Sequence, residues 1–134
     1  ILEKSSTIAV VGMSRDSWKP AHTVPAYLIR QGYDVIPVNP FAEIILEREC
    51  YGTLQDIARP VQIVNVFRPS DQALAVVQQA IQRKQEKGDI ELIWLQLGIV
   101  NNEAKQLAEE NNILFVQDRC LYVEHKLAGI NRIV

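Results

Sequence analysis

The chain has 134 residues, of which 48% are hydrophobic and 22% are charged, so it is long enough to bury the core of one domain. Its 14 basic and 16 acidic residues give a formal net charge of −2, which argues against nucleic acid as a partner because nucleic-acid-binding surfaces cluster basic charge. No apolar run approaches the roughly 20 residues of a membrane-spanning helix, so we expect no membrane association and a cytoplasmic protein. The sequence begins at Ile1 and not at Met, which leaves open whether further residues or a removed targeting segment precede it.

Continuous apolar runs alternate with amphipathic segments along the whole sequence. Such runs are typical of parallel strands that are covered on both faces. They predict five strands, at Thr7–Val11, Asp34–Val38, Val61–Phe67, Ile90–Leu97 and Ile113–Val116.

The segments between these strands carry helix signals. Thr23 is the expected N-cap of a first helix that runs to about Gln31, with Pro25 in its first turn. Ser70 is the expected cap of a long helix that stops near Gly88. Shorter helices are predicted at Leu54–Ala58, Asn102–Asn111 and Leu121–Leu127, and the rest of the stretch from Phe41 to Pro60 is expected to be irregular.

Five strands separated by helices predict one α/β domain over residues 1–134, a Rossmann-like three-layer domain with a five-stranded, mainly parallel sheet. Ligands of such folds bind outside the carboxyl ends of the strands, where the strand order reverses. The segments at those ends are 12–20, 39–40, 67–69, 96–98 and 117–119. We therefore expect the functional residues among them.

The loop after the first strand has features of an anion-binding turn. Gly12 follows the strand directly, so a phosphate could approach the backbone there, aided by the amides and the dipole of the next helix. Ser14 offers a hydroxyl, and Arg15 and Lys19 offer positive charge. The alternative is a tight turn with surface cations. The three-glycine dinucleotide fingerprint is absent, because Gly12 is the only glycine before Gly32.

The end of the second strand argues against a nicotinamide dinucleotide. An NAD site usually places Asp or Glu there to bond the ribose, but the strand ends in Asn39-Pro40 and the first carboxylate is Glu43. An NADP site usually has an arginine near this strand end, but the next basic residue after the strand is Arg48. Asn39 before a rigid proline instead predicts a neutral wall against an adenine or ribose.

Later strand ends allow two interpretations each. Arg68 could face a ligand or pair with Asp71. Gln96 and Gly98 suit a polar contact and a close backbone approach, with a purely structural role equally open. Trp18 could cover an adenine or pack on the neighbouring helix.

Signals for catalysis or metal binding are weak. Four residues near the C-terminus could suggest a thiol–imidazole–carboxylate site, namely Asp118, Cys120, Glu124 and His125. Glu124 and His125 are adjacent and do not share one helix face, so we favour an exposed pair at a helix end and predict no catalytic residue. His22 could reach a phosphate or face solvent. The two histidines have no carboxylate at ligand spacing, so no metal site is predicted. Cys50 and Cys120 lack CxxC spacing and are expected to be free thiols, mostly buried.

Several of these segments together resemble a known family, the small bacterial CoA-binding-domain proteins, which are related in fold to the nucleotide-binding domain of the succinyl-CoA synthetase α-subunit. The similarity covers almost the whole chain. The matching segments are Ala9–Ser14, Lys19-Pro20, Gly32–Pro40, Cys50-Tyr51, Val64–Pro69, Trp94–Ile99 and Asp118–Cys120. One departure is Glu47, where the family commonly has glycine, and this leaves the conformation of that loop open.

The resemblance implies coenzyme A or an acyl-CoA as the ligand. Its phosphates would lie at the loop that starts with Gly12, and its nucleotide end would lie between the second and third strand ends. The implied binding residues are Gly12, Met13, Ser14, Arg15, Lys19, Pro20, Val38, Asn39, Pro40, Phe67, Arg68, Pro69, Gln96 and Gly98. The ligase relatives carry their phosphorylated histidine in a separate domain that this sequence lacks, so the resemblance supports binding and not a reaction.

The leading interpretation is therefore a non-catalytic CoA-binding module, such as a carrier, sensor or regulator. The alternatives are an enzyme that acts on an acyl-CoA thioester through Cys120 or His125 and, with less support, a nicotinamide-dependent oxidoreductase. An exposed sheet edge or the tail Leu121–Val134 could support a homodimer.

Overall fold

The architecture is a five-stranded parallel sheet with helices on both faces. We describe residues 7–129 of a computed structural model. The sheet has the order β2-β1-β5-β6-β7, and its strands are β1 (Thr7–Val11), β2 (Asp34–Val38), β5 (Ile63–Val66), β6 (Leu92–Leu95) and β7 (Leu114–Val116). The helices are α1 (Pro20–Arg30), α2 (Ser70–Lys87), α3 (Asn102–Glu110) and α4 (Leu121–Leu127). The predicted Rossmann-like α/β fold is confirmed.

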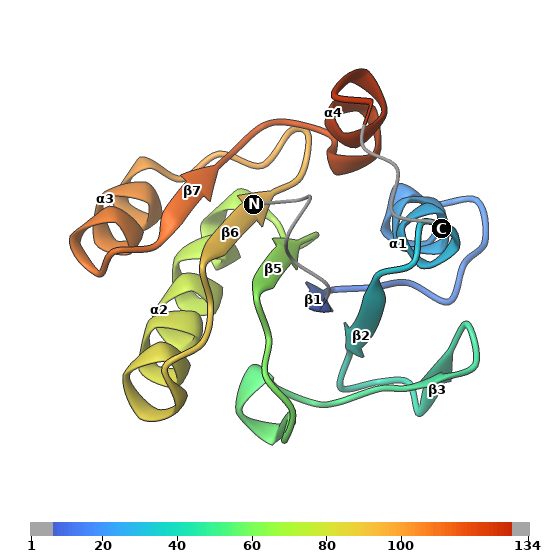
Figure 1. Cartoon of the computed structure of the whole chain (residues 1–134), viewed down its shortest axis with the longest axis horizontal. Coiled ribbons are helices and arrows are strands. Elements are labelled where there is room, and N and C mark those ends of the chain that lie inside the picture. The colour runs from blue at the N-terminus through green and yellow to red at the C-terminus, as the bar shows by residue number, and fades with distance from the viewer. Residues whose placement is uncertain (1–6, 130–134) are drawn as a thin grey trace.

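The two faces of the sheet pack against different helices. In β1, Ala9 and Val11 belong to one core cluster, together with buried residues of α2 and α3, while Ile8 and Val10 belong to a second cluster with residues of α1 and α4. This division follows from the strand geometry, because successive side chains point to opposite faces. Figure 1 shows α2 and α3 on one side of the sheet and α1 and α4 on the other. The continuous apolar runs in the sequence are thus explained by burial on both faces.

The strand order places a switch point beside β1. From β1 the chain passes through α1 to β2 on one side, and it later returns to β5 on the other side of β1. The loops that follow β1 and β5 therefore diverge at the carboxyl edge of the sheet. This is the position at which parallel α/β sheets bind ligands.

Two predicted helix starts were wrong. α1 begins at Pro20 with Lys19 as its N-cap, so Thr23 is not a cap and Pro25 lies inside the helix. Proline is well suited to the first helical position, because it has no amide hydrogen to satisfy and its φ is preset. Ser70 is the first residue of α2, after Pro69 as N-cap. Its hydroxyl does not cap the helix but accepts a hydrogen bond from the amide of Val100 at 3.0 Å.

The stretch from Phe41 to Pro60 contains the predicted short helix, as a 3-10 helix, and also a small hairpin where irregular structure was expected. The strands β3 (Ile44–Ile45) and β4 (Arg48–Glu49) pair antiparallel, and η1 covers Leu54–Asp56. The turn residues Leu46 and Glu47 both have positive φ, of 53° and 63°. Positive φ at both central positions defines a type I′ turn, which strongly prefers Asn-Gly. Glu47 therefore holds a conformation that favours glycine.

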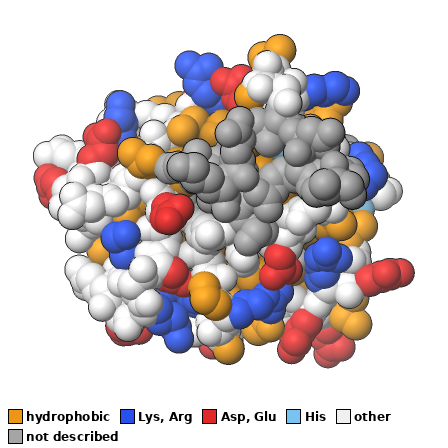
Figure 2. Space-filling model, viewed as in Figure 1, with side chains coloured by type: hydrophobic (Ala, Val, Ile, Leu, Met, Phe, Trp, Pro, Cys, Tyr) orange, Lys and Arg blue, Asp and Glu red, His pale blue; other side chains and the backbone are white. Residues whose placement is uncertain are grey.

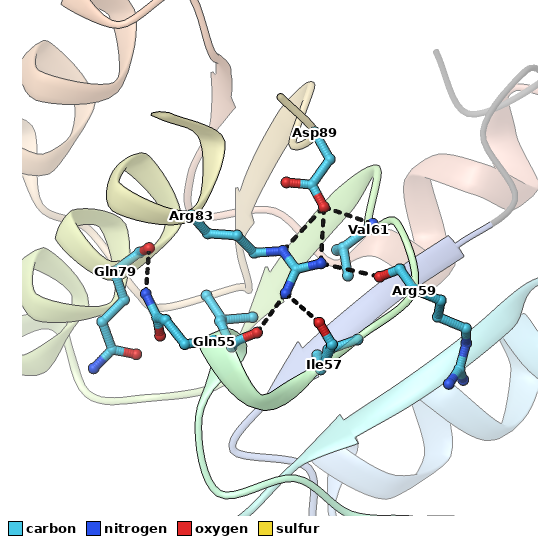
Figure 3. A network of polar contacts seen from close by, with 8 residues as sticks. Gln55, Ile57, Arg59, Val61, Gln79, Arg83 and Asp89 are labelled. Atoms are coloured by element: carbon cyan, nitrogen blue, oxygen red, sulfur yellow. Dashed lines mark hydrogen bonds and ion pairs between the residues drawn. The ribbon is translucent and has the colours of Figure 1, made fainter. Parts of the chain in front are cut away.

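A buried arginine bonds the backbone just before β5, at the edge of the sheet opposite to the carboxyl ends of the strands (Figure 3). Arg83 of α2 is fully buried. Its Nη1 donates to the carbonyls of Leu54 and Ile57 at 2.6 and 2.8 Å, and its Nη2 donates to the carbonyl of Arg59 at 2.9 Å. The same guanidinium pairs with Asp89 at 2.9 Å. These bonds hold the segment from η1 to β5 against the end of α2.

Asp89 extends this network into the sheet. Its Oδ2 also accepts a hydrogen bond from the amide of Val61 at 2.9 Å, just before β5. A buried charge that loses its partners is strongly destabilising, because its desolvation is no longer offset. The network is therefore expected to stabilise the sheet edge far from the candidate ligand site.

We predict that Arg83→Met lowers the free energy of unfolding by about 3–5 kcal/mol, because the charge of Asp89 and three carbonyls lose their donor. Urea denaturation followed by circular dichroism measures this loss. The matched control is Gln78→Met, an exposed position on the same helix, which should change stability by less than about 0.5 kcal/mol. A loss below 1 kcal/mol in Arg83→Met would contradict the assigned role.

We also predict that Glu47→Gly raises the free energy of unfolding by up to about 1 kcal/mol, because glycine removes the left-handed penalty in the turn. Chemical denaturation gives the difference. Glu49→Gly, two residues later in β4, is the control and should instead destabilise, since glycine inside a strand costs about 0.5–1 kcal/mol. Equal effects of the two substitutions would refute the strain argument.

Candidate functional site

Gly12 lies where the ends of β1, β2 and β5 meet. Its amide donates to the carbonyl of Val38 at 2.9 Å, and the amide of Phe67 donates to the carbonyl of Val11 at 2.9 Å. Gly12 has a φ of +87°, and a Cβ at this position would lie 3.0 Å from the carbonyl oxygen of Phe67 and 3.1 Å from Cδ of Arg68. Both the backbone conformation and the close approach of the next strand end require glycine here.

The loop after Gly12 is fastened to α1 through Ser14. The amide of Ser14 donates to the carbonyl of Ala21 at 3.0 Å. In a regular helix that carbonyl would accept from residue 25, but Pro25 has no amide hydrogen, so it is left for the loop. Nδ1 of His22 donates to the carbonyl of Ser14 at 2.7 Å, because a carbonyl oxygen can only accept. Ser14 is thus held by two contacts with the first turns of α1.

One amide of this loop stays available to a ligand. The hydroxyl of Ser14 accepts from the amide of Asp16 at 3.0 Å, so part of its bonding capacity is used inside the loop. By contrast, the amides of Met13 and Arg15 donate to no acceptor within residues 7–129. Amides at the start of a helix are suited to binding phosphate. Met13 is fully buried, so of these two amides the one available to an anion belongs to Arg15, which is exposed.

The cations predicted around the loop differ in how they are engaged. Lys19 forms an exposed ion pair with Asp16 at 3.1 Å. Arg68 crosses in front of Gly12 and donates to the side chain of Gln72, not to Asp71. Arg15 is exposed and has no ion pair with a described carboxylate. Basic and acidic side chains are interspersed over the face that Figure 2 shows.

Arg15 also lies near the end of the small hairpin. Burial raises the pKa of the Cys50 thiol, while a hydrogen bond with the backbone of Ile45 and the positive charge of Arg15 oppose this rise. Cys50 and Cys120 are both free, as predicted, but they are half-buried and not mostly buried. The hairpin and the loop after β1 are therefore neighbours at the carboxyl edge of β2.

Asn39 connects the end of β2 to the loop. Its Nδ2 donates to the carbonyl of Met13 at 2.9 Å, and its Oδ1 accepts from the amide of Phe41 at 2.8 Å. Its own amide donates to the carbonyl of Tyr51 at 2.9 Å. The side chain of Asn39 thus positions the anion loop from the β2 side. Pro40 and Phe41 follow it and are exposed at this edge.

At the end of β6, Gln96 and Gly98 both make structural hydrogen bonds, one of the two roles that the sequence left open. Gln96 turns inward, with 4% of its surface exposed. Its Oε1 accepts from Nδ2 of Asn65 and from the amide of Leu121, both at 3.3 Å. Gly98 has a φ of +86° and its amide donates to Oδ1 of Asp118 at 2.8 Å. No atom lies within 4 Å of a Cβ built on Gly98, so its conformation, not a neighbouring atom of the chain, accounts for the glycine.

The candidate catalytic residues of the C-terminal segment do not face one another. His125 is fully buried and hydrogen bonds with the hydroxyl of Tyr27 at 2.7 Å, so the expectation of an exposed Glu124–His125 pair was wrong for His125. The tyrosine of α1 draws it inward between α1 and α4. Glu124 pairs with Arg119 at 3.3 Å instead, and Cys120 precedes α4.

Neither a metal cluster nor a membrane span is found within residues 7–129. No group of three or more His, Cys, Asp and Glu side chains there could hold a metal ion. None of the helices in the same range combines the length and apolar character needed to cross a bilayer.

Comparison with known proteins points to one family. The family model described as a CoA binding domain matches residues 6–126. An uncharacterized Bacillus subtilis protein, YneT, is 36% identical over 125 residues, which cover 93% of this chain and 89% of that protein. A solved structure from Thermus thermophilus is 40% identical with a TM-score of 0.87, covering 94% of this chain and 92% of that one. An ADP-forming acetate–CoA ligase of Archaeoglobus fulgidus is 35% identical over 66 residues, 48% of this chain but 10% of the ligase.

We predict that Gly12→Ala destabilises the fold by more than Gly98→Ala does. The two glycines have nearly the same φ, but only Gly12 has neighbours within 4 Å of the added Cβ. Gly98→Ala should therefore cost about 1–2 kcal/mol for the left-handed backbone alone, and Gly12→Ala should add a steric cost to this. Denaturant unfolding of both variants measures the difference, and equal losses would contradict the close approach at Gly12.

Proposed function

The chain belongs to the CoA binding domain family, and on that premise we propose that it binds coenzyme A or an acyl-CoA at the switch point between β1 and β5. The observation that carries this proposal is the loop at Gly12. There the amide of Arg15, an exposed residue, has no acceptor among the described residues, while Asn39 and Ala21 hold the loop in place. A preorganised loop with unused donors is suited to a phosphate group.

In this proposal the phosphates of the ligand lie against the loop of β1. Arg15 supplies the unpaired positive charge, and Arg68 lies directly across Gly12. Lys19 contributes less, since Asp16 already neutralises part of its charge. The nucleotide end would lie between the segments Val38–Pro40 and Phe67–Pro69, and Trp18, with 74% of its surface exposed, is available to stack on a base.

The same geometry disfavours a nicotinamide dinucleotide. A carboxylate that could bond the ribose is missing at the end of β2, and the side chain of Asn39 already bonds Met13 and Phe41. Two of the groups considered for thioester chemistry also have other partners, since His125 bonds Tyr27 and Glu124 pairs with Arg119. We therefore propose a binding module, such as a carrier, sensor or regulator, over an enzyme.

Isothermal titration calorimetry tests this proposal with CoA, acetyl-CoA, NAD and NADP as ligands. We expect CoA or acetyl-CoA to bind and both nicotinamide dinucleotides to bind at least tenfold more weakly. At 100 times its dissociation constant the ligand should stabilise the fold by about 2.7 kcal/mol. Binding of NAD or NADP without binding of CoA would overturn the proposal.

The Arg15→Glu variant tests where the phosphates lie. It should weaken CoA binding roughly tenfold at low ionic strength and clearly less in 0.5 M salt, because salt screens the exposed charge. Arg30→Glu reverses an exposed charge at the other end of α1 and serves as the control, with little effect expected. A loss for Arg15→Glu that does not depend on salt would indicate a structural role for Arg15.

A further inference from the structure

We propose that the side chains of Asn65 and Gln96 form a binding site for a secondary amide, namely one amide of the pantetheine arm of CoA. This inference rests on the proposed function and adds a second ligand contact, at the ends of β5 and β6. It starts from an unsatisfied polar atom in the core. Asn65 is fully buried, and its Oδ1 accepts no hydrogen bond from the described residues.

The place of Asn65 in the sheet puts it near the ligand edge. It is the third residue of β5, beside Val10 of β1 and Trp94 of β6 in the register. These two neighbours pack in the cluster with α1 and α4, so Asn65 lies on that face of the sheet. Val66 is the last residue of β5, which leaves Asn65 one residue from the carboxyl edge.

The orientation of the Asn65 amide is fixed by its surroundings. Its Nδ2 donates to the carbonyl of Trp94 and to Oε1 of Gln96, both at 3.3 Å. Turning the amide over would place Oδ1 against these two acceptors, so the assignment of nitrogen and oxygen follows from the network. A buried acceptor without a donor costs about 1–3 kcal/mol, and native proteins rarely leave one so.

Gln96 supplies the complementary group. Its Oε1 accepts from Asn65 and from the amide of Leu121, which fixes its orientation in the same way. Its Nε2 then remains as a donor that bonds no acceptor within residues 7–129. The adjoining carboxamides thus offer one acceptor and one donor. A secondary amide, with one N–H and one carbonyl, is the group that matches both.

The ligand chemistry fits the position of this pair. The pantetheine arm of CoA is uncharged and contains two secondary amides, whereas the phosphates would lie at the loop after β1. Gln96 follows β6 directly, and Asn65 lies on β5, the strand next to β1. Oδ1 of Asn65 is buried, so an arm that leaves the phosphates would have to enter beside Leu121, whose amide bonds Gln96, to reach these carboxamides. A buried water molecule could also satisfy Asn65, and the experiment separates the two.

The test compares CoA with 3′-phospho-ADP, which keeps all the phosphates and the base but lacks the arm. Asn65→Leu keeps the side-chain volume and removes the acceptor. We expect the variant to bind CoA about tenfold more weakly, as loss of one buried hydrogen bond would produce, and to bind 3′-phospho-ADP within twofold of the unmodified protein. Gln106→Leu, an exposed carboxamide of α3, is the control and should change neither affinity.

Each other outcome decides the matter. Equal losses for both ligands would mean that Asn65 acts on the fold or the anion loop, and unchanged CoA affinity would mean that a water molecule satisfies it; either result overturns the inference while the proposed function stands. If the unmodified protein binds neither ligand, the proposed function itself fails. A second measurement, made on the unmodified protein, keeps the inference testable if Asn65→Leu folds poorly. In ¹⁵N-labelled protein the side-chain amide resonances of Asn65 and Gln96 should shift with CoA and not with 3′-phospho-ADP, and the absence of that difference would also overturn the inference.

Discussion

The close approach of β1 and β5 at Gly12 is the constraint from which the rest of the carboxyl edge follows. β1 lies between β2 and β5, and the segments after both neighbours run past its end. Gly12 bonds the β2 side through its amide, and the carbonyl of Phe67 stands where a Cβ would be. Only a residue without a side chain, in a left-handed conformation, lets the chain turn there. That turn sends the loop across the switch point.

Some of the remaining polar groups of this edge make hydrogen bonds that hold the loop, and others make no hydrogen bond within the described residues. Pro25 has no amide hydrogen to donate to the carbonyl of Ala21, so that carbonyl accepts from the amide of Ser14 instead. Asn39 holds the loop from the other side through Met13. A proline inside a helix and an asparagine after a strand are thus structural, while the amide of Arg15 has no acceptor within residues 7–129. Such a division makes a binding site rigid without occupying it, and rigidity lowers the entropic cost of binding.

Much of the sheet could be predicted from sequence because parallel strands buried on both faces are continuous apolar runs, as in β1 and β6. The switch-point loop was located by the rule for strand ends, and the mainly parallel five-stranded sheet proved correct. Local signals failed where tertiary contacts decide. Thr23 has the residue type of a cap but Pro20 starts the helix, and the hairpin turn at Leu46 and Glu47 lacks the glycine by which such turns are recognised. Arg83 carries no sequence signal, because its partners are mostly backbone carbonyls.

Asn65 shows why a proposed binding residue inside a strand is also hidden from sequence reasoning. It stands in an apolar run and its neighbours in the register are hydrophobic, so only the geometry reveals that its oxygen has no donor among the described residues. The contrast with the C-terminal segment is informative. Catalysis needs a nucleophile and a base that face each other, and here Glu124 and His125 are turned to other partners. Binding needs fixed groups with unused hydrogen-bonding capacity. The carboxyl edge offers such a group at Arg15 and, in the proposal made above, at the Asn65–Gln96 pair, which is the arrangement expected of a module that holds a long ligand at two points.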